Sequence, residues 1–193
     1  MKLVGFVLAT AIVALLAFPG SALAQSPGDS SYYFVTYYSN NVSGAPDEVV
    51  RIINDGETGG TLWADFYVFD DSEELSECCS CPITADGLLS ESVQKELMAN
   101  PLSGPVRTRG VIKVIADSAG DLYSPTPSAG LHGWATHIQK AASGYDISES
   151  SLADSNLGGD DLYGWTMPYI CEILIELGEG YGACSCTSED NDF

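Results

Sequence analysis

The chain has 193 residues, of which 27 are acidic and 7 are basic, so its net charge is −20 at pH 7. A surface this acidic repels nucleic acid and anionic lipid, which excludes a function that depends on either. It favours solubility, cations or a basic partner, and a solvated acidic surface is its simplest interpretation. The length is that of one domain with a real hydrophobic core.

The start of the chain has the pattern of a secretory signal peptide. Lys2 precedes an apolar run over residues 3–18, and Ala22-Leu23-Ala24 supplies the small residues of a cleavage site. The run is shorter than the roughly 20 residues of a membrane-spanning helix. We therefore expect a signal peptide over residues 1–24 and one secreted domain, extracellular or periplasmic, over residues 25–193. No membrane span is expected after cleavage.

The six cysteines form two groups that are far apart in the sequence: Cys78, Cys79 and Cys81, and Cys171, Cys184 and Cys186. Paired thiols form disulfides in an oxidising compartment, so all six are predicted to be bridged. A bridge between the adjacent Cys78 and Cys79 would be strained, and Cys184 and Cys186 are too close for a relaxed one, so at least two bridges should join the groups. Each such bridge closes a loop of about 100 residues, which is worth roughly 4–5 kcal/mol. Neither group has the spacing of a zinc site, which makes a metal the weaker alternative.

Aromatic and β-branched residues between turn signals predict several short strands. In chain order these are residues 32–38, 48–53, 61–69, 88–97, 110–116 and 131–138. Residues 54–60 have the composition of a hairpin connection. Residues 131–138 are the last predicted strand, and residues 139–160 after it are polar and rich in Gly and Ser.

Residues 61–69 form the strongest predicted strand, and both of its faces carry apolar side chains. Leu62, Ala64, Phe66 and Val68 share one face, while Trp63, Tyr67 and Phe69 share the other. Three aromatic side chains on one face are rarely left in water. We favour a cover by the C-terminal helix, and the alternative is an open face that binds another chain. Trp63, Tyr67 and Phe69 are therefore the candidate binding residues.

One helix is predicted, over residues 162–177, from apolar residues at helical spacing. Pro168 implies a kink or a late start. Ile173 and Leu177 are expected to face the sheet, with Glu172 and Glu176 in water. Short strands followed by one helix predict a mainly β fold: an antiparallel β-sandwich, Ig-like or jelly-roll-like, with one C-terminal α-helix and disulfide cross-links.

The sequence contains little that indicates catalysis. Its two histidines, His132 and His137, lie five residues apart in one predicted strand and hence on opposite faces. No nucleophile elbow, zinc-protease motif or phosphate loop is present, and nothing singles out an acid–base pair among the acids. No cofactor is expected.

Residues 154–161 are rich in oxygen-bearing side chains and resemble the first half of a calcium loop. The weak calcium candidates are Asp154, Asn156, Asp160 and Asp161. The twelfth position holds Trp165 instead of the bidentate glutamate, which excludes an EF-hand. The simpler interpretation is a helix start, where Asp160 and Asp161 favour the helix dipole.

The Cys78–Pro82 block, the following Asp86–Leu89 segment, the late helix with its cysteine and the Gly180–Cys186 ending together resemble an uncharacterised family of secreted bacterial proteins with six cysteines. This resemblance implies export and disulfides, and it adds no site.

Two functions from different classes follow from these features. The favoured hypothesis is a secreted, disulfide-stabilised structural or binding protein at the cell exterior, with a protein partner or self-assembly. The alternative is a secreted hydrolase with a carboxylate-based active site. A cleft with two facing carboxylates would distinguish the second from the first.

Overall fold

The computed structural model describes residues 32–40, 42–102, 107–155 and 166–187. Its elements, in chain order, are β1 Tyr33–Ser39, β2 Val49–Asn54, β3 Leu62–Asp70, β4 Leu75–Ile83, β5 Leu88–Ser92, the π-helix η1 Val93–Leu97, β6 Arg109–Asp117, β7 Leu131–Lys140, β8 Tyr145–Ser151, β9 Ala153–Asp154 and the α-helix α2 Met167–Leu177. The fold is therefore mainly β with a C-terminal helix, as predicted.

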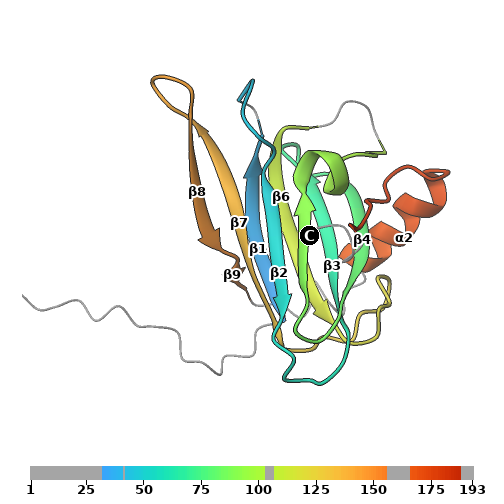
Figure 1. Ribbon diagram of the computed structural model, residues 1–193. Helices are drawn as coiled ribbons and strands as arrows, with labels where there is room; N and C mark the ends of the chain where they lie inside the picture. The colour runs from blue at the N-terminus through green and yellow to red at the C-terminus, as the bar shows by residue number, and fades with distance from the viewer. Residues whose placement is uncertain (1–31, 41, 103–106, 156–165, 188–193) are drawn as a thin grey trace, which may run out of the picture.

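The strands form two antiparallel sheets that pack as a sandwich. Sheet A has the order β4-β3-β6-β1-β9 and sheet B the order β5-β2-β7-β8. Side chains of both sheets fill the core between them, among them Phe66 and Ile112 from sheet A and Ile52 and Leu89 from sheet B. Figure 1 shows α2 beside β4 at one side of the sandwich and the β7–β8 hairpin at the opposite side.

The alternation along β3 builds two cores at once. Leu62, Ala64, Phe66 and Val68 face the core between the sheets, as the sequence predicts. The opposite face belongs to a second cluster, in which Tyr67 packs with Cys78, Ile115, Cys171 and Leu174. The helix thus covers the outer face of sheet A.

Three disulfides join the two cysteine groups, which confirms the predicted cross-links. They are Cys78–Cys171, Cys79–Cys184 and Cys81–Cys186. All three start from β4, whose successive side chains point to opposite faces. Cys78 therefore ties α2 to the outer face, while Cys79 and Cys81 tie the C-terminal segment to the core between the sheets.

Several predicted boundaries are wrong. Only the first half of residues 88–97 is strand, because the ladder with β2 ends at Ser92 and η1 follows. Residues 54–60 are no hairpin connection, since β2 and β3 belong to different sheets. Residues 131–138 are not the last strand, since β8 and β9 follow them. The cysteine block itself is a strand, β4.

The helix begins late, at Met167 with Pro168 next, which agrees with one of the two expected effects of the proline. Its orientation differs from the prediction. Leu177 is 75% exposed, while Met167, Cys171 and Leu174 face the sheet. The Cys78–Cys171 bridge fixes the rotation of the helix, and Leu177 lies six residues from Cys171, away from the positions that share its face.

None of the helices in the described residues is long and apolar enough to span a membrane.

The orientation of α2 can be tested with a matched pair of leucines. Replacing Leu174, which is 5% exposed, by Ala is expected to lower the free energy of unfolding by about 2–4 kcal/mol, because it leaves a cavity under the helix. The same change at Leu177 should cost no more than about 0.5 kcal/mol. Denaturant unfolding of the oxidised proteins measures both, and equal losses would contradict this orientation.

Candidate functional site

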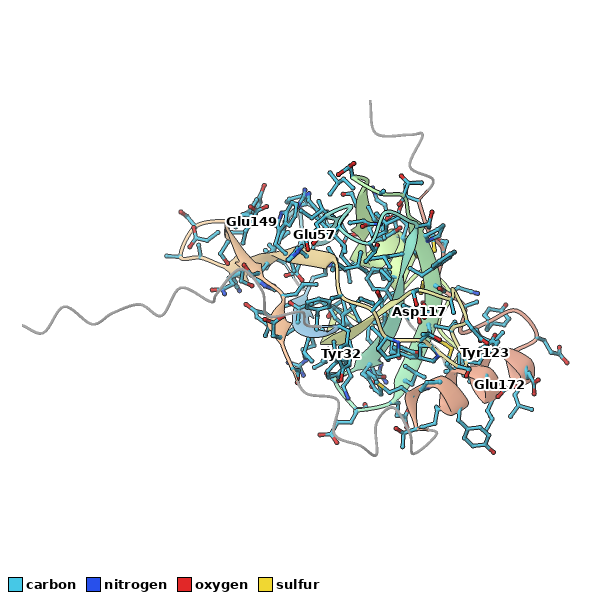
Figure 2. The ribbon with its side chains drawn as sticks, turned by 90° about the horizontal axis from the view of Figure 1, so that it is seen from below. Tyr32, Glu57, Asp117, Tyr123, Glu149 and Glu172 are labelled. Atoms are coloured by element: carbon cyan, nitrogen blue, oxygen red, sulfur yellow. A yellow bond between two sulfur atoms is a disulfide. The ribbon has the colours of Figure 1, made fainter. Side chains whose placement is uncertain are left out.

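A cluster of acidic side chains lies on the outer face of sheet A, where β3, β4 and β6 meet the loop after β6. Asp65 and Asp117 are both fully buried. Ser80 Oγ donates to Asp65 Oδ1 at 2.5 Å. Asp117 accepts the backbone N–H groups of Ala119, Asp121 and Thr126 at 2.6–3.0 Å. Asp117 therefore anchors the start of the loop, whose Tyr123 lies near Glu172 of α2 (Figure 2).

Burial gives Asp65 an unusual protonation state. Desolvation is the main cause that raises the pKa of its carboxyl to about 8; the Ser80 hydrogen bond opposes the rise, and the charges of Asp117 and Asp121 add to it. Within the described residues its Oδ2 has no hydrogen-bond partner. With this pKa the neutral form of Asp65 predominates at pH 7, and the side chain is fully buried. The pair does not form the open cleft with two facing carboxylates that a hydrolase needs.

Three further buried carboxylates receive backbone N–H groups from distant segments. Glu48 accepts from Ser39 and Ile138, Glu77 accepts from Asn100 and Glu91 accepts from Thr187, all at 2.7–2.9 Å. Burial raises all three pKa values, that of Glu77 to about 8 and that of Glu91 to about 7. These acids pin irregular chain segments to the sheets, which is a structural role.

The histidines lie apart, on opposite faces of β7. His132 Nε2 lies 3.0 Å from Asp55 Oδ2 on the exposed face. His137 is buried, stacks on Tyr37 with ring centroids 4.1 Å apart and lies 2.8 Å from Ser150 Oγ through Nε2. Its Nδ1 is buried without a partner among the described residues. This serine–histidine pair lacks the acid that orients the imidazole in a catalytic triad.

A hollow of about 590 Å³ lies at the β1–β2 loop. Its lining includes Asn40, Asp47, Gln94 and Lys95. Asp47 is its single acid among the described residues, and its Oδ2 accepts the Gln94 N–H at 2.9 Å. A hollow whose one carboxylate already accepts a backbone hydrogen bond does not supply both a general acid and a general base.

The β7–β8 hairpin contains a strand, β8, that is exposed along its whole length. All 7 residues of β8 are exposed, and within the described residues β8 pairs only with β7. Ile147 is 53% exposed on the same face as Glu149, which lies 3.5 Å from Arg51. Figure 2 places Glu149 on the opposite side of the molecule from Tyr123 and Glu172. The outer face of sheet B, unlike that of sheet A, has no helix over it in the described residues.

The candidate binding aromatics lie at the covered face of sheet A. Tyr67 is fully buried, and its hydroxyl donates to Leu122 O at 2.8 Å. Phe69 is partly buried against the α2 cluster. Trp63 is partly buried, and its indole lies against Gly120, where a Cβ would come within 2.7 Å of the ring. The helix thus packs in one cluster with Tyr67, Phe69 lies at the margin of that cluster, and the loop after β6 covers Trp63.

Of the calcium candidates, only Asp154 belongs to the described residues, where it lies exposed in β9. Asn156, Asp160 and Asp161 lie outside them. Among the described residues, one set of three metal-ligating side chains is close-set: Cys79, Cys81 and Cys186. Their sulfurs are held in disulfides.

Sequence reasoning missed the residues that distinguish this structure most. Nothing in the sequence distinguishes Asp65 and Glu77 from the other acids among the 27, and only the fold shows that these two are buried. The exposed strand β8 carries Tyr145 and Ile147 at alternate positions, a short signal hidden among serines and acids. That alternation was the one available indication of a strand.

Comparison with known proteins adds little. No family model matches the chain, and no curated protein matches it. Among solved structures, the crystal structure of Thermotoga maritima 1070 is similar over 66% of this chain and 97% of that one, with a TM-score of 0.45 and 12% identity.

The buried carboxyls predict how stability depends on pH. Asp65 and Glu77 have folded-state pKa values of about 8, above their usual values of 3.8 and 4.5. The folded state therefore binds more protons than the unfolded state. The contribution of these two carboxyls to the free energy of unfolding is complete below about pH 4 and is lost as the pH rises through 8. Replacing Asp65 by Asn removes one titrating group and should flatten the fall by about 1.4 kcal/mol per pH unit.

Urea unfolding between about pH 5 and pH 8 measures this slope, and the Glu77→Gln variant is the matched comparison for the second group. An Asp65→Asn variant with the slope of the unmodified protein would show that Asp65 is ionised in the folded state, contrary to this prediction.

Proposed function

We propose that the protein is an exported, disulfide-stabilised binding protein that takes an extended segment of a basic partner protein along the free edge of β8. The observation that carries this proposal is the exposure of β8 along its whole length. An unpaired strand edge presents N–H and C=O groups that another chain can complete as an added strand.

Export is part of the same proposal. The signal-peptide pattern of residues 1–24 supports it, and so do the three disulfides, which persist in oxidising compartments. We infer an extracellular or periplasmic location. Membership of the six-cysteine family of secreted bacterial proteins fits the same features and remains part of the proposal.

The hydrogen-bond register shows which backbone groups β8 offers. Two hydrogen bonds flank its ladder with β7: Leu152 N–H donates to Gly133 O, and Ala141 N–H donates to Gly144 O. Bonded and non-bonded pairs alternate in an antiparallel ladder. The even-numbered residues of β8 therefore bond to β7, while the odd-numbered ones, including Ile147, turn their N–H and C=O groups to the free edge.

Charge identifies the kind of partner. β8 carries Asp146 and Glu149 and no basic residue, on a chain with a net charge of −20. Two β8 edges paired with each other would bring like charges together, which destabilises a strand pair. A basic extended segment instead meets complementary charge, which favours association.

A synthetic peptide of alternating Lys and Val residues is a direct probe of this edge. Its binding is expected to slow amide hydrogen exchange at Ile147 and Glu149, because their N–H groups become bonded, while exchange elsewhere changes little. Hydrogen-exchange mass spectrometry measures the effect, and added salt should weaken it.

The matched variants are Ile147→Pro and Ile147→Ala. Proline removes the outward N–H without removing a bond to β7, and it is tolerated where that N–H faces solvent. The proline variant should lose the protection, while the alanine variant should keep most of it. Equal binding by both would mean that the peptide is held by charge alone, and edge pairing would be wrong. Protection that appears without peptide as the protein concentration rises would indicate self-assembly instead.

A further inference from the structure

The three disulfides differ in how open they are to an external thiol. Both sulfurs of Cys78–Cys171 belong to residues that are fully buried. Cys81 is also fully buried, but its partner Cys186 is exposed. An incoming thiolate therefore reaches the Cys81–Cys186 bridge at Cys186, while the bridge that holds α2 is shielded.

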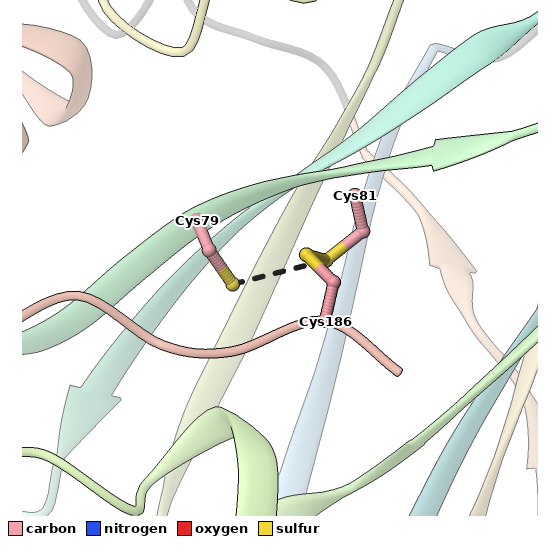
Figure 3. Close-up of side chains that lie close together, drawn as sticks. All are labelled: Cys79, Cys81 and Cys186. Atoms are coloured by element: carbon pink, nitrogen blue, oxygen red, sulfur yellow. Dashed lines mark hydrogen bonds between the residues drawn. A yellow bond between two sulfur atoms is a disulfide. The ribbon is translucent and has the colours of Figure 1, made fainter. Parts of the chain in front are cut away.

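The second and third bridges lie against each other. Cys79 Sγ is 3.9 Å from Cys81 Sγ, and the sulfurs of Cys79, Cys81 and Cys186 all lie within 4.8 Å of one another (Figure 3). The cause is the strand itself, because residues two apart in β4 point to the same face. A thiolate formed at Cys81 thus lies beside the neighbouring disulfide.

We propose that these two bridges form a thiol-exchange site, at which one external dithiol opens both in sequence. In the first step a thiolate of the dithiol attacks Cys186 Sγ, and Cys81 leaves as a thiolate. In the second, Cys81 attacks Cys79 Sγ, the Cys79–Cys81 disulfide forms and Cys184 leaves. In the third, the second thiol of the dithiol attacks the mixed disulfide, which releases Cys186 and the cyclic oxidised reductant.

The exchange balances without another reactant. Two disulfides and one dithiol give the Cys79–Cys81 disulfide, the oxidised reductant and two free thiols, at Cys184 and Cys186. Two electrons pass from the dithiol to the protein. Protons released by the dithiol end on the two free cysteines.

Burial supplies the direction of the internal step. A thiolate at Cys81 lies in the apolar core between the sheets, where desolvation disfavours charge. Transfer to Cys79 moves the unpaired sulfur to Cys184, which is only partly buried. The exchange therefore moves the charge from a fully buried residue to a partly exposed one at the margin of the core.

Its structural consequence is release of the C-terminal segment over residues 182–187. This segment runs along β4, with Cys78 N–H bonded to Gly182 O at 2.9 Å and Cys184 N–H bonded to Cys78 O at 3.2 Å. Thr187 N–H and Oγ also donate to the buried Glu91. The Cys78–Cys171 bridge stays closed, so α2 remains in place while the edges of β4 and β5 open.

Limiting reduction of the folded protein tests the order of events. The oxidised protein is treated with one equivalent of dithiothreitol, its free thiols are alkylated, and its peptides are mapped without further reduction. Equal label on Cys184 and Cys186 is expected, with Cys79–Cys81 formed and Cys78–Cys171 intact. Label on Cys81 and Cys186 with Cys79–Cys184 intact would overturn the internal transfer. Label on Cys171 at this stage would overturn the order of opening.

The double variant Cys79→Ser, Cys184→Ser removes the acceptor bridge and is the matched control. One equivalent of reductant should now label Cys81 and Cys186. A time course on the unmodified protein gives an independent measure: label should appear on Cys184 with no lag behind Cys186. A separate, slower phase for Cys184 that requires a second equivalent of dithiol would contradict the proposal.

Discussion

The rest of the structure depends on one strand, β4, which carries half of the cysteines. Because successive side chains of a strand point to opposite faces, Cys78 reaches the helix on the outer face of sheet A, while Cys79 and Cys81 reach the C-terminal segment. The first bridge closes a loop of about 100 residues and contributes roughly 4–5 kcal/mol through the unfolded state. The other two close loops that the first already shortens, so their entropic contributions are smaller.

The helix shows why this covalent link matters. It has 11 residues and carries no acid in its first turn, and within the described residues the N-cap residue makes no side-chain capping hydrogen bond. A helix this short is marginal in water by itself. Its position therefore rests on the Cys78–Cys171 bridge and on the apolar contacts of Met167 and Leu174 with the outer face of sheet A. That face holds Tyr67 and so needs a cover.

The sequence could predict features that depend on one segment, but not those that depend on contacts between distant segments. The two faces of β3 were predictable, because apolar alternation is visible within one segment. The cross-linking of the cysteine groups was predictable too, because a signal-peptide pattern and an even number of cysteines indicate disulfides. The exposed strand β8 was not, since its apolar alternation is limited to Tyr145 and Ile147, which stand among serines and acids. Nor was the rotation of α2, where Leu177 and Leu174 look alike until the bridge at Cys171 fixes which faces the sheet. Nor was the burial of Asp65, because only the fold brings Ser80, Asp117 and Asp121 close to it.

The two ends of the sheets, at β4 and β5 and at β8, differ in how their strand edges are protected. Strand edges invite pairing with other chains, and proteins cover or charge them. At the β4–β5 side the C-terminal segment covers the edge, fixed by two disulfides and by Thr187 on Glu91. At β8 the protection is charge alone, through Asp146 and Glu149. Charge of one sign repels a second copy of the same edge, but it attracts a basic chain. The edge at β4 and β5 is therefore covered while its bridges last, whereas on the proposed function the β8 edge would select its partners by their charge.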